Sequence, residues 1–339
     1  MKICVLGAGT WGMALAALLE KNRHDVTVWS ALPNEIDELE KNGIHKNLPG
    51  IKLSKSIKYT KDIKAAAEGK EMILLVVPSS FIRSTTYNLA PYIEDGTILV
   101  TAAKGIECGS LMTMTEIISD ELKTLRPDLK YSLGALSGPT HAEEVALGMP
   151  TSIVSACDDE EISARIAEVF ANSCMRVYTN NDVRGVEICG AMKNIIALAA
   201  GINNGMGLGD NSKAMLMTRG IAEISRLGVA LGGQSHTFSG LSGVGDLIVT
   251  CISNHSRNRR FGLLVGGGMP VEQALEEVGA VVEGYFATRA VQELTRDMNL
   301  DMPICQAMYA ILVEQKPLED VVQTLLGRAK RAEQDAYEA

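Results

Sequence analysis

The sequence is poor in aromatic residues, which make up 4% of the chain, and it lacks any C-x-x-C pair among its seven cysteines. Scattered cysteines in odd number argue against a disulfide framework or a zinc site and are typical of free thiols in a reducing cytoplasm. The five histidines show no metal-ligand spacing, and neither H-E-x-x-H nor G-x-S-x-G occurs. We therefore predict a cytoplasmic protein without a catalytic metal.

The chain also lacks an excess of positive charge, since its formal net charge is −9. That balance argues against general binding to nucleic acid or to a membrane surface. It does not exclude an anionic small molecule, because screening limits the reach of charge to about 8 Å and a local basic cluster decides such binding. The apolar stretch 188–209 is broken by glycines, asparagines and one lysine, so we predict no membrane span. The apolar run at the N-terminus is too short for a signal peptide.

The length of 339 residues suggests two domains, and a hydrophobic content of 46% is ordinary for a globular protein. In the first half, short apolar runs alternate with segments that can form helices, which favours a parallel, doubly wound sheet. We predict an α/β Rossmann-type domain over 1–182 and an all-α domain over 183–339, joined by a long helix. The predicted strands are 2–7, 25–30, 72–78, 97–102, 131–137, 151–156 and 175–179; the later helices are 212–228, 271–279, 285–298 and 304–327.

A glycine-rich motif follows the first predicted strand. Gly7, Gly9 and Gly12 fit G-x-G-x-x-G, with Thr10 and Trp11 between the last two glycines, and an alanine- and leucine-rich helix follows. This context predicts dinucleotide binding, because the glycines let the backbone approach a pyrophosphate at a helix N-terminus. The second strand ends in 29–32 (WSAL), which offers neither an acid nor an arginine to the ribose. The choice between NADH and NADPH therefore stays open.

Polar residues follow several predicted strands, at the sheet edge where ligands of such folds bind. Lys104 follows the fourth strand, and Gly138 and Thr140 follow the fifth. Lys104 fits either a surface lysine or a ligand contact. Thr140 and Glu143 fit a helix capping box, and a helix start at this edge also suits an anion.

Lys193 lies inside the apolar stretch 188–209 and has small neighbours at helical spacing, including Gly190, Ala197 and Gly201. Small residues let another backbone or a ligand approach closely. One interpretation is a lysine whose amine reaches water along an apolar surface. The other is a lysine in a cleft, where desolvation lowers the pKa and suits the amine to proton transfer.

Two loops in the second half carry further candidates. The glycine-rich segment 239–246 lacks the G-K-[ST] of a P-loop and ends in Asp246, which fits either a helix cap or a site residue. Three arginines then occur within residues 257–260, next to Ser256 and Asn258. Arginine matches phosphate oxygens in bidentate fashion, so this segment indicates a phosphate site, with a solvated basic face as the alternative.

Taken together, these motifs resemble those of the bacterial NAD(P)-dependent sn-glycerol-3-phosphate dehydrogenases. The resemblance implies interconversion of dihydroxyacetone phosphate and sn-glycerol 3-phosphate for phospholipid synthesis, a nucleotide domain followed by a helical domain, and a homodimer. The matching segments are GAGTWG at 7, VVPS at 76, AKGIE at 103, LSGPTHAEEV at 136, EICGAMKNIIALAAGI at 187, LSGVGDL at 241, SRNRRFG at 256 and VVEG at 281.

The resemblance also implies roles for individual residues, with Lys193 as the general acid and base. Where the family often carries an arginine for the 2′-phosphate, this sequence has Ala31. Another two-domain reductase of a small substrate, such as a hydroxyacid or ketopantoate-like molecule, or an NAD(P)H sensor without catalysis, would share part of the pattern. The implied substrate residues are Lys104, Gly138, Thr140, Lys193, Asp246, Ser256, Arg257 and Asn258; the implied cofactor residues are Gly7, Gly9, Thr10, Trp11, Gly12, Lys104, Ala142, Arg257, Val281 and Glu283.

Overall fold

The computed structural model describes residues 1–329 and 332–333 and divides the chain into two compact units. The first, here called the sheet unit, comprises residues 1–103 and 114–183. The second, the helical unit, comprises 104–113 and the chain from 184 onward. The predicted boundary after residue 182 stays a prediction, and the end of the predicted second domain, at 330–331 and 334–339, lies outside the described residues.

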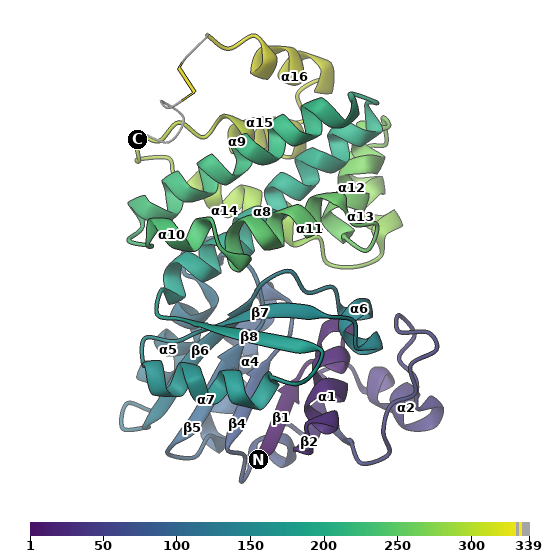
Figure 1. Ribbon diagram of the computed structural model, residues 1–339, viewed down its shortest axis with the longest axis vertical. Coiled ribbons are helices and arrows are strands. Elements are labelled where there is room, and N and C mark those ends of the chain that lie inside the picture. The colour runs from purple at the N-terminus through teal and green to yellow at the C-terminus, as the bar shows by residue number, and fades with distance from the viewer. Residues whose placement is uncertain (330–331, 334–339) are drawn as a thin grey trace. The chain divides into compact units, whose positions relative to one another are not determined.

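The sheet unit is built on one eight-stranded sheet with the order β3-β2-β1-β4-β5-β6-β7-β8 (Figure 1). All neighbouring strands pair in parallel except β6 and β7, which are antiparallel. The central strands are apolar and wholly buried, as expected of a sheet covered on both faces. The strands are β1 (Lys2–Leu6), β2 (Asp25–Trp29), β3 (Lys58–Thr60), β4 (Met72–Leu75), β5 (Thr97–Thr101), β6 (Tyr131–Ser137), β7 (Thr151–Ala156) and β8 (Met175–Asn180).

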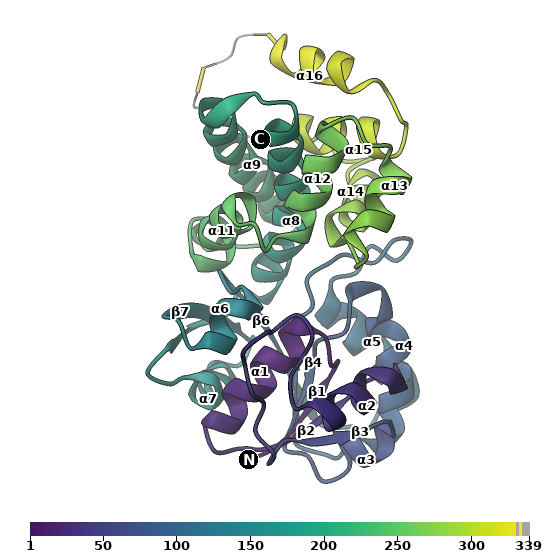
Figure 2. The ribbon, with the colours of Figure 1, turned by 90° about the vertical axis from the view of Figure 1, so that its right-hand side faces the viewer.

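Helices cover both faces of this sheet (Figure 2). One layer contains α1, α6 and α7, and the other contains α3, α4 and α5. The chain turns from one layer to the other between β1 and β4, where the strand order reverses and a ligand crevice is expected. The helices are α1 (Thr10–Lys21), α2 (Pro33–Asn42), α3 (Ile63–Ala67), α4 (Ile82–Leu89), α5 (Met114–Leu125), α6 (Ala142–Leu147) and α7 (Glu160–Phe170).

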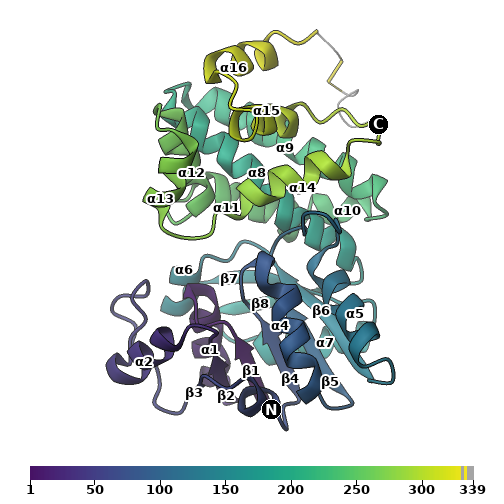
Figure 3. The same ribbon diagram turned by 180° about the vertical axis from the view of Figure 1, so that it is seen from behind.

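The helical unit surrounds one long central helix, α8 (Val183–Gly205), whose residues 185–203 are buried (Figure 3). By length and composition α8 could cross a membrane, but its apolar window is entirely buried inside the protein, which is the position of a core helix. The other helices are α9 (Gly209–Ala230), α10 (Ser235–Phe238), α11 (Asp246–Ile252), α12 (Arg257–Gly266), α13 (Val271–Val278), α14 (Glu283–Leu294), α15 (Pro303–Leu312) and α16 (Leu318–Leu326).

The segment 104–113 joins the helical unit although it lies between two elements of the sheet unit in the sequence. Ile106 is buried in the helical core and forms an isolated bridge with Thr113. The Thr113 hydroxyl donates to the Glu187 carboxylate at 2.8 Å. These contacts fix the segment, and Lys104 at its start, to the helical unit.

The predicted strands and helices differ from the structure at several places. The two segments of the second half that were predicted as loops are helical in part, since Leu241–Gly245 is a π-helical turn and Arg257–Gly266 is α12. The sequence-based helix over 304–327 is two helices, because Gln315 adopts a left-handed conformation (φ 54) and Pro317 precedes α16. Strand β3 was missed because it has only three residues, none of them fully buried. The β6–β7 pair is antiparallel, whereas the sequence favoured a parallel sheet. The connection between the two strands, residues 138–150, therefore begins and ends at the same edge of the sheet, the one at the carboxyl end of β6.

Candidate active site

The loop after β1 has the geometry that a pyrophosphate requires. Gly7 has a φ of 123°, and a Cβ there would lie 2.9 Å from the carbonyl of Val76. A Cβ at Gly12 would lie 1.9 Å from the Gly7 oxygen, whereas a Cβ at Gly9 would meet no described atom within 4 Å. Gly9 also precedes α1, and no side chain of the described residues caps that helix. The loop therefore leaves an open position at a helix N-terminus, which suits an anion.

Thr10 and Trp11 open α1 beside this position. Thr10 is buried, and its hydroxyl accepts a hydrogen bond from the Asn47 side chain at 3.1 Å. Trp11 is half-buried and packs against the core of the sheet unit. Asn47 was not singled out from the sequence, because it lies in a loop with no periodic pattern, far from the motif along the chain.

The edge after β6 carries Gly138, Thr140 and Ala142. Gly138 has a φ of 152° and a Cβ there would lie 3.1 Å from the Ile153 Cα, so the position requires glycine. The predicted capping box is wrong, because α6 is preceded by His141 and the Thr140 hydroxyl instead donates to the Gly138 carbonyl at 3.1 Å. Ala142 is the first residue of α6 and is half-buried.

A buried carboxylate between two lysines is the main feature of the helical unit. Lys193 Nζ lies 2.6 Å from Asp246 Oδ1, and Lys104 Nζ lies 2.6 Å from Asp246 Oδ2. The exposed fractions of these side chains are 9% for Lys193, 17% for Lys104 and 2% for Asp246. Asp246 is the first residue of α11 and makes no capping bond, so the helix-cap interpretation is wrong.

The glycine-rich segment before Asp246 sets its position. Residues Leu241–Gly245 form one turn of π-helix, a rare conformation that often marks functional sites. A Cβ at Gly243 would lie 1.9 Å from the Phe238 oxygen, so this turn forms only with glycine there. The glycine-rich segment therefore positions Asp246, the first residue of α11, beside the two lysines.

Thr250 completes this cluster and was missed by the sequence analysis. Its hydroxyl donates to the Asp246 backbone carbonyl at 2.6 Å and accepts from Lys193 Nζ at 2.9 Å. The available signal was spacing, since residues four apart share one face of a helix and Thr250 is four residues after Asp246. With its hydrogen directed at the carbonyl, the hydroxyl presents a lone pair to the lysine.

The charges in the cluster shift one another's titration. Burial lowers the pKa of Lys193 to about 8, with a smaller lowering by the Lys104 ammonium and an opposing effect of the Asp246 carboxylate. Burial would raise the pKa of Asp246, but the two lysines outweigh it and hold that pKa below its ordinary value. The cluster therefore contains an ionised carboxylate and an amine that can gain or lose a proton near neutral pH.

Helix α12, which carries the arginine segment, packs directly on α8. A Cβ at Gly201 of α8 would lie 2.1 Å from the Arg259 oxygen, and a Cβ at Gly262 of α12 would lie 2.1 Å from the Leu198 oxygen. Gly205 and Gly266 make the same kind of approach one turn later. Of the two explanations for small residues beside Lys193, the structure shows the close backbone approach at Gly201. The crossing fixes α12 relative to the lysine.

The three arginines differ in their partners among the described residues. Arg259 donates to the Asn254 side chain at 2.8 Å, and Arg260 donates to the Glu277 and Val278 carbonyls at the end of α13. Arg257 is exposed and makes no hydrogen bond or ion pair with any described residue. The basic segment is therefore partly structural, and Arg257 is its candidate phosphate ligand.

Ser256 and Asn258 flank Arg257 and already have structural partners. The buried Ser256 hydroxyl accepts from the Arg259 amide at 3.2 Å and so caps α12. Asn258 donates to the Asn194 side chain and accepts from the Gly284 amide, both at 2.9 Å. Asn258 thereby connects α12 to the residue next to Lys193 and to the first turn of α14.

Val281 and Glu283 lie at this start of α14. Glu283 is its first residue and Val281 lies two residues earlier, and both are half-buried. A Cβ at Gly284 would lie 2.6 Å from the Asn194 oxygen, so α14 also contacts α8 at close range. The helical unit thus brings the starts of α11, α12 and α14 together along α8.

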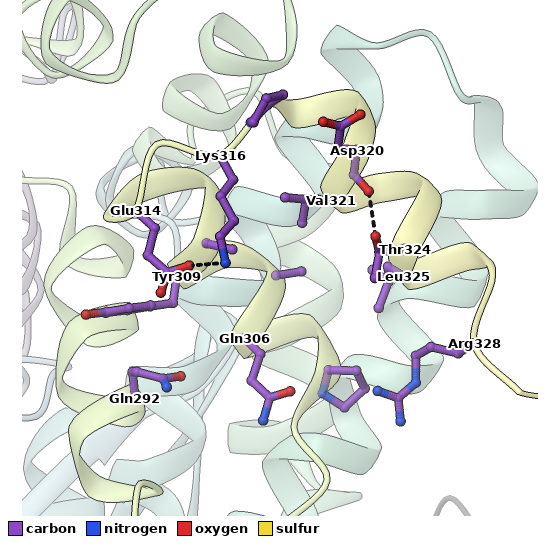
Figure 4. A pocket seen from close by; sticks show the side chains of 14 residues that line it. Gln292, Gln306, Tyr309, Glu314, Lys316, Asp320, Val321, Thr324, Leu325 and Arg328 are labelled. Atoms are coloured by element: carbon purple, nitrogen blue, oxygen red, sulfur yellow. Dashed lines mark hydrogen bonds and ion pairs between the residues drawn. The ribbon is translucent and has the colours of Figure 1, made fainter.

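A cavity of about 440 Å³ in the helical unit lies among α14, α15 and α16 (Figure 4). Two of its cations already have partners: Lys316 pairs with Glu314 at 2.7 Å, and Arg328 pairs with Asp301 at 2.7 Å. None of the sequence-predicted site residues lines it. We assign no ligand to this cavity.

A mostly parallel sheet with an open glycine loop and a helical unit with a titratable buried lysine together define a Rossmann-type dehydrogenase. Family models agree on both parts: the N-terminus of NAD-dependent glycerol-3-phosphate dehydrogenase matches residues 2–163, and its C-terminus matches 182–323. The chain belongs to the NAD-dependent glycerol-3-phosphate dehydrogenase family. It is an NAD(P)-dependent oxidoreductase, as the resemblance implied.

Individual relatives agree with this family. The chain is 51% identical over 332 residues to glycerol-3-phosphate dehydrogenase (NAD(P)+) 2 of Lactobacillus delbrueckii subsp. bulgaricus, covering 98% of each chain. It is 47% identical over 334 residues to the Fusobacterium nucleatum enzyme, again covering 98% of each. The crystal structure of glycerol-3-phosphate dehydrogenase from Coxiella burnetii shares 37% identity with a TM-score of 0.91, covering 96% of this chain and 99% of that one.

Proposed function

We propose that this enzyme interconverts dihydroxyacetone phosphate and sn-glycerol 3-phosphate with NADH or NADPH. The observation that carries the proposal is the Lys193–Asp246–Lys104 cluster, because cofactor binding alone requires neither Lys193 nor Asp246. The bound cofactor supplies the hydride that reduces the C2 carbonyl. The chain's own residues then have three tasks: to protonate the carbonyl oxygen, to hold the phosphate and to bind the dinucleotide.

Lys193 is the proposed general acid and base. As an ammonium ion it stabilises the negative charge that develops on the C2 oxygen and then donates its proton to that oxygen. In the oxidation of glycerol 3-phosphate the neutral amine takes the proton from the C2 hydroxyl. A pKa near 8 suits both directions, since each protonation state is populated near neutral pH.

Asp246 and Thr250 position this amine. The carboxylate and the hydroxyl take two of the three donor positions of the Lys193 ammonium, at 2.6 Å and 2.9 Å. The third position remains for the substrate oxygen. Lys104, on the other carboxylate oxygen, opposes the raising effect of Asp246 on the Lys193 pKa and is proposed to contact substrate and cofactor.

Arg257 is the proposed ligand of the substrate phosphate, because its guanidinium is exposed and unpaired among the described residues. Ser256 and Asn258 would support it from the first turn of α12, whose amides favour an anion. Gly138 and Thr140 complete the proposed substrate set. Binding the phosphate holds the reacting carbon in place, which raises the rate beyond the effect of proton transfer alone.

The proposed dinucleotide contacts are the loop of Gly7, Gly9 and Gly12 and a second set of residues. The loop fits the pyrophosphate because the Cβ direction of Gly9 is open and the helix start behind it has no side-chain cap. The second set is Thr10, Trp11, Lys104, Ala142, Arg257, Val281 and Glu283.

The cellular setting is part of the proposal. We propose a cytoplasmic homodimer that supplies glycerol phosphate for phospholipid synthesis. Scattered cysteines support the cytoplasm, since six of the seven are buried or half-buried thiols without partners in a disulfide. Sedimentation of the purified protein would test the dimer.

The first experiment is oxidation of NADH and NADPH, in parallel, with dihydroxyacetone phosphate and with unphosphorylated dihydroxyacetone. The proposal requires turnover with the phosphorylated ketone and a large loss without the phosphate. Equal rates would favour a reductase of another small substrate. Binding of NADH without turnover would favour a sensor.

Lys193→Ala tests the central residue. We expect kcat to fall by about 10²–10⁴-fold, the usual worth of a positioned acid, while the melting temperature and cofactor binding show that the protein is folded. Near-normal kcat in a folded variant would contradict the assignment.

A further inference from the structure

An acidic side chain lies at the carboxyl end of β2, although the residues that directly end the strand are uncharged. Ser30 follows β2, is 5% exposed and donates its hydroxyl hydrogen to Glu35 Oε2 at 2.6 Å. Glu35 stands in the first turn of α2 and is half-buried. The same Ser30 oxygen accepts a hydrogen bond from the Leu32 amide at 3.1 Å. The Ser30 side chain therefore makes two hydrogen bonds across the turn between β2 and α2.

Ser30, which holds this carboxylate, lies beside the start of the glycine-rich loop. Leu6 pairs with Trp29 in the parallel ladder, and the Gly7 amide donates to the Trp29 carbonyl at 2.8 Å. Ser30 is therefore level with the start of the glycine loop and one strand spacing, about 4.8 Å, to its side. That is the position from which an acid at the end of the second strand reaches the adenosine ribose in dinucleotide-binding folds.

We propose that Glu35, held by Ser30, accepts a hydrogen bond from the ribose 2′-hydroxyl and makes the enzyme prefer NADH over NADPH. The inference rests on the proposed dinucleotide site and names its specificity-determining residue. A 2′-phosphate would place roughly two negative charges beside this carboxylate, which repels them. It would also replace the hydroxyl group that donates a hydrogen bond to the carboxylate. Specificity then comes from a repulsive contact as well as an attractive one.

The neighbouring charges are consistent with this preference. Residues 30–36 contain no arginine, lysine or histidine. Lys61, whose backbone carbonyl accepts from the Trp29 ring, pairs its own ammonium with Asp37 at 2.5 Å. Lys46 is exposed in the loop that also carries Asn47, the partner of Thr10, and it is the basic residue that could oppose the proposal.

Binding without substrate gives the sharpest test. The intact enzyme is titrated with NADH and with NADPH by fluorescence, and 5′-AMP and 2′,5′-ADP are compared as competitors. We expect NADH to bind at least about tenfold more tightly than NADPH, and 5′-AMP to compete better than 2′,5′-ADP. These ratios do not depend on turnover, so a failure of the proposed reaction and a failure of this inference are told apart.

Two variants and a control test whether Glu35 and Ser30 cause the preference for NADH. Glu35→Gln removes the charge at nearly constant size and should reduce the NADH preference about tenfold, mainly through tighter NADPH binding. Ser30→Ala leaves the carboxylate but releases it, and should reduce the preference by a smaller factor; it also tests the idea if Glu35→Gln fails to fold. Glu38→Gln removes an exposed acid one turn along α2 and should change neither ratio.

Several outcomes would overturn the inference. One is equal affinity of the unaltered enzyme for the two cofactors, and another is a Glu35→Gln ratio that matches that of Glu38→Gln. A third is tighter binding of NADPH that Lys46→Ala weakens tenfold, which would assign the 2′-position to the lysine.

Discussion

Gly201 of α8 and Gly262 of α12 lie against each other's helix backbones. The Cα of Gly262 would be 2.9 Å from a Cβ at Gly201, and the Cα of Gly201 would be 3.0 Å from a Cβ at Gly262. Each contact is with backbone and not with the end of a flexible side chain. Neither helix can move away without displacing Lys193 or Arg257, which they carry.

Gly262→Ala is therefore expected to destabilise the helical unit. One added methyl group would overlap the Leu198 carbonyl at 2.1 Å, and overpacking of this kind costs about 1–3 kcal/mol or more. Urea unfolding monitored by circular dichroism measures the loss. Gly9→Ala is the matched change, since its Cβ would meet no described atom within 4 Å, and it should leave the free energy of unfolding nearly unaltered.

The same Gly9→Ala variant should instead lose cofactor affinity. Its added methyl group would occupy the open position that we assign to the pyrophosphate, so we expect the NADH dissociation constant to rise by about tenfold or more. Fluorescence titration without substrate measures it. Unaltered affinity in this variant would place the pyrophosphate away from the loop.

The pH dependence of the two reaction directions should cross near the pKa of Lys193. Burial lowers that pKa to about 8. Reduction of the ketone needs the ammonium form, so its rate falls as pH rises through about 8. Oxidation needs the neutral amine, so its rate rises over the same interval. Profiles of kcat/KM in both directions give the midpoint, and a shared midpoint is the expected result.

Lys104→Met should move this midpoint to higher pH. The Lys104 ammonium lowers the pKa of Lys193, and its removal leaves Asp246 to stabilise the protonated amine alone. Lys213→Met is the control, because Lys213 pairs with the exposed Asp210 on α9. A midpoint that stays in place in Lys104→Met, or that moves equally in both variants, would contradict the electrostatic account.

Arg257→Ala should raise KM for dihydroxyacetone phosphate by about 10–100-fold, the loss expected for a charge-assisted contact worth about 1.5–3 kcal/mol. Its effect with unphosphorylated dihydroxyacetone should be small. Arg260→Ala removes a guanidinium that binds two backbone carbonyls at the end of α13. That control should lower stability and leave KM near normal; a reversed pattern would assign the phosphate to Arg260.

The local motifs of the sheet unit could be predicted because each one is continuous in sequence. The glycines of residues 7–12 follow a buried strand and open a helix, and the structure gives each the conformation or the space that the motif implies. The strands β1, β2, β4 and β5 were predicted to within three residues at their ends, because they are short, buried apolar runs. The role of the glycines in binding a dinucleotide stays a prediction.

The helical unit was harder to predict because its site residues meet through packing. Asp246 is 53 residues from Lys193, and no periodic pattern connects them. From the sequence alone its carboxylate also fits a helix cap, whereas the structure has a lysine on each of its oxygens. Asn194 was missed for the same reason, since its partner Asn258 is 64 residues away. Thr250 was missed although it lies four residues after Asp246, and Glu35 was missed because the turn that brings it to Ser30 has no sequence signature.

The segment 104–113 has a consequence for how this enzyme can be divided. The chain enters the helical unit at 104, leaves it after 113 and enters it again at 184. A fragment that begins at 184 would contain Lys193 and Asp246 but not Lys104, and would lose the Ile106 and Thr113 contacts with its core. The two units therefore cannot be separated by a single cut in the coding sequence. A gene fusion or domain exchange made with one such cut would contain an incomplete charge cluster.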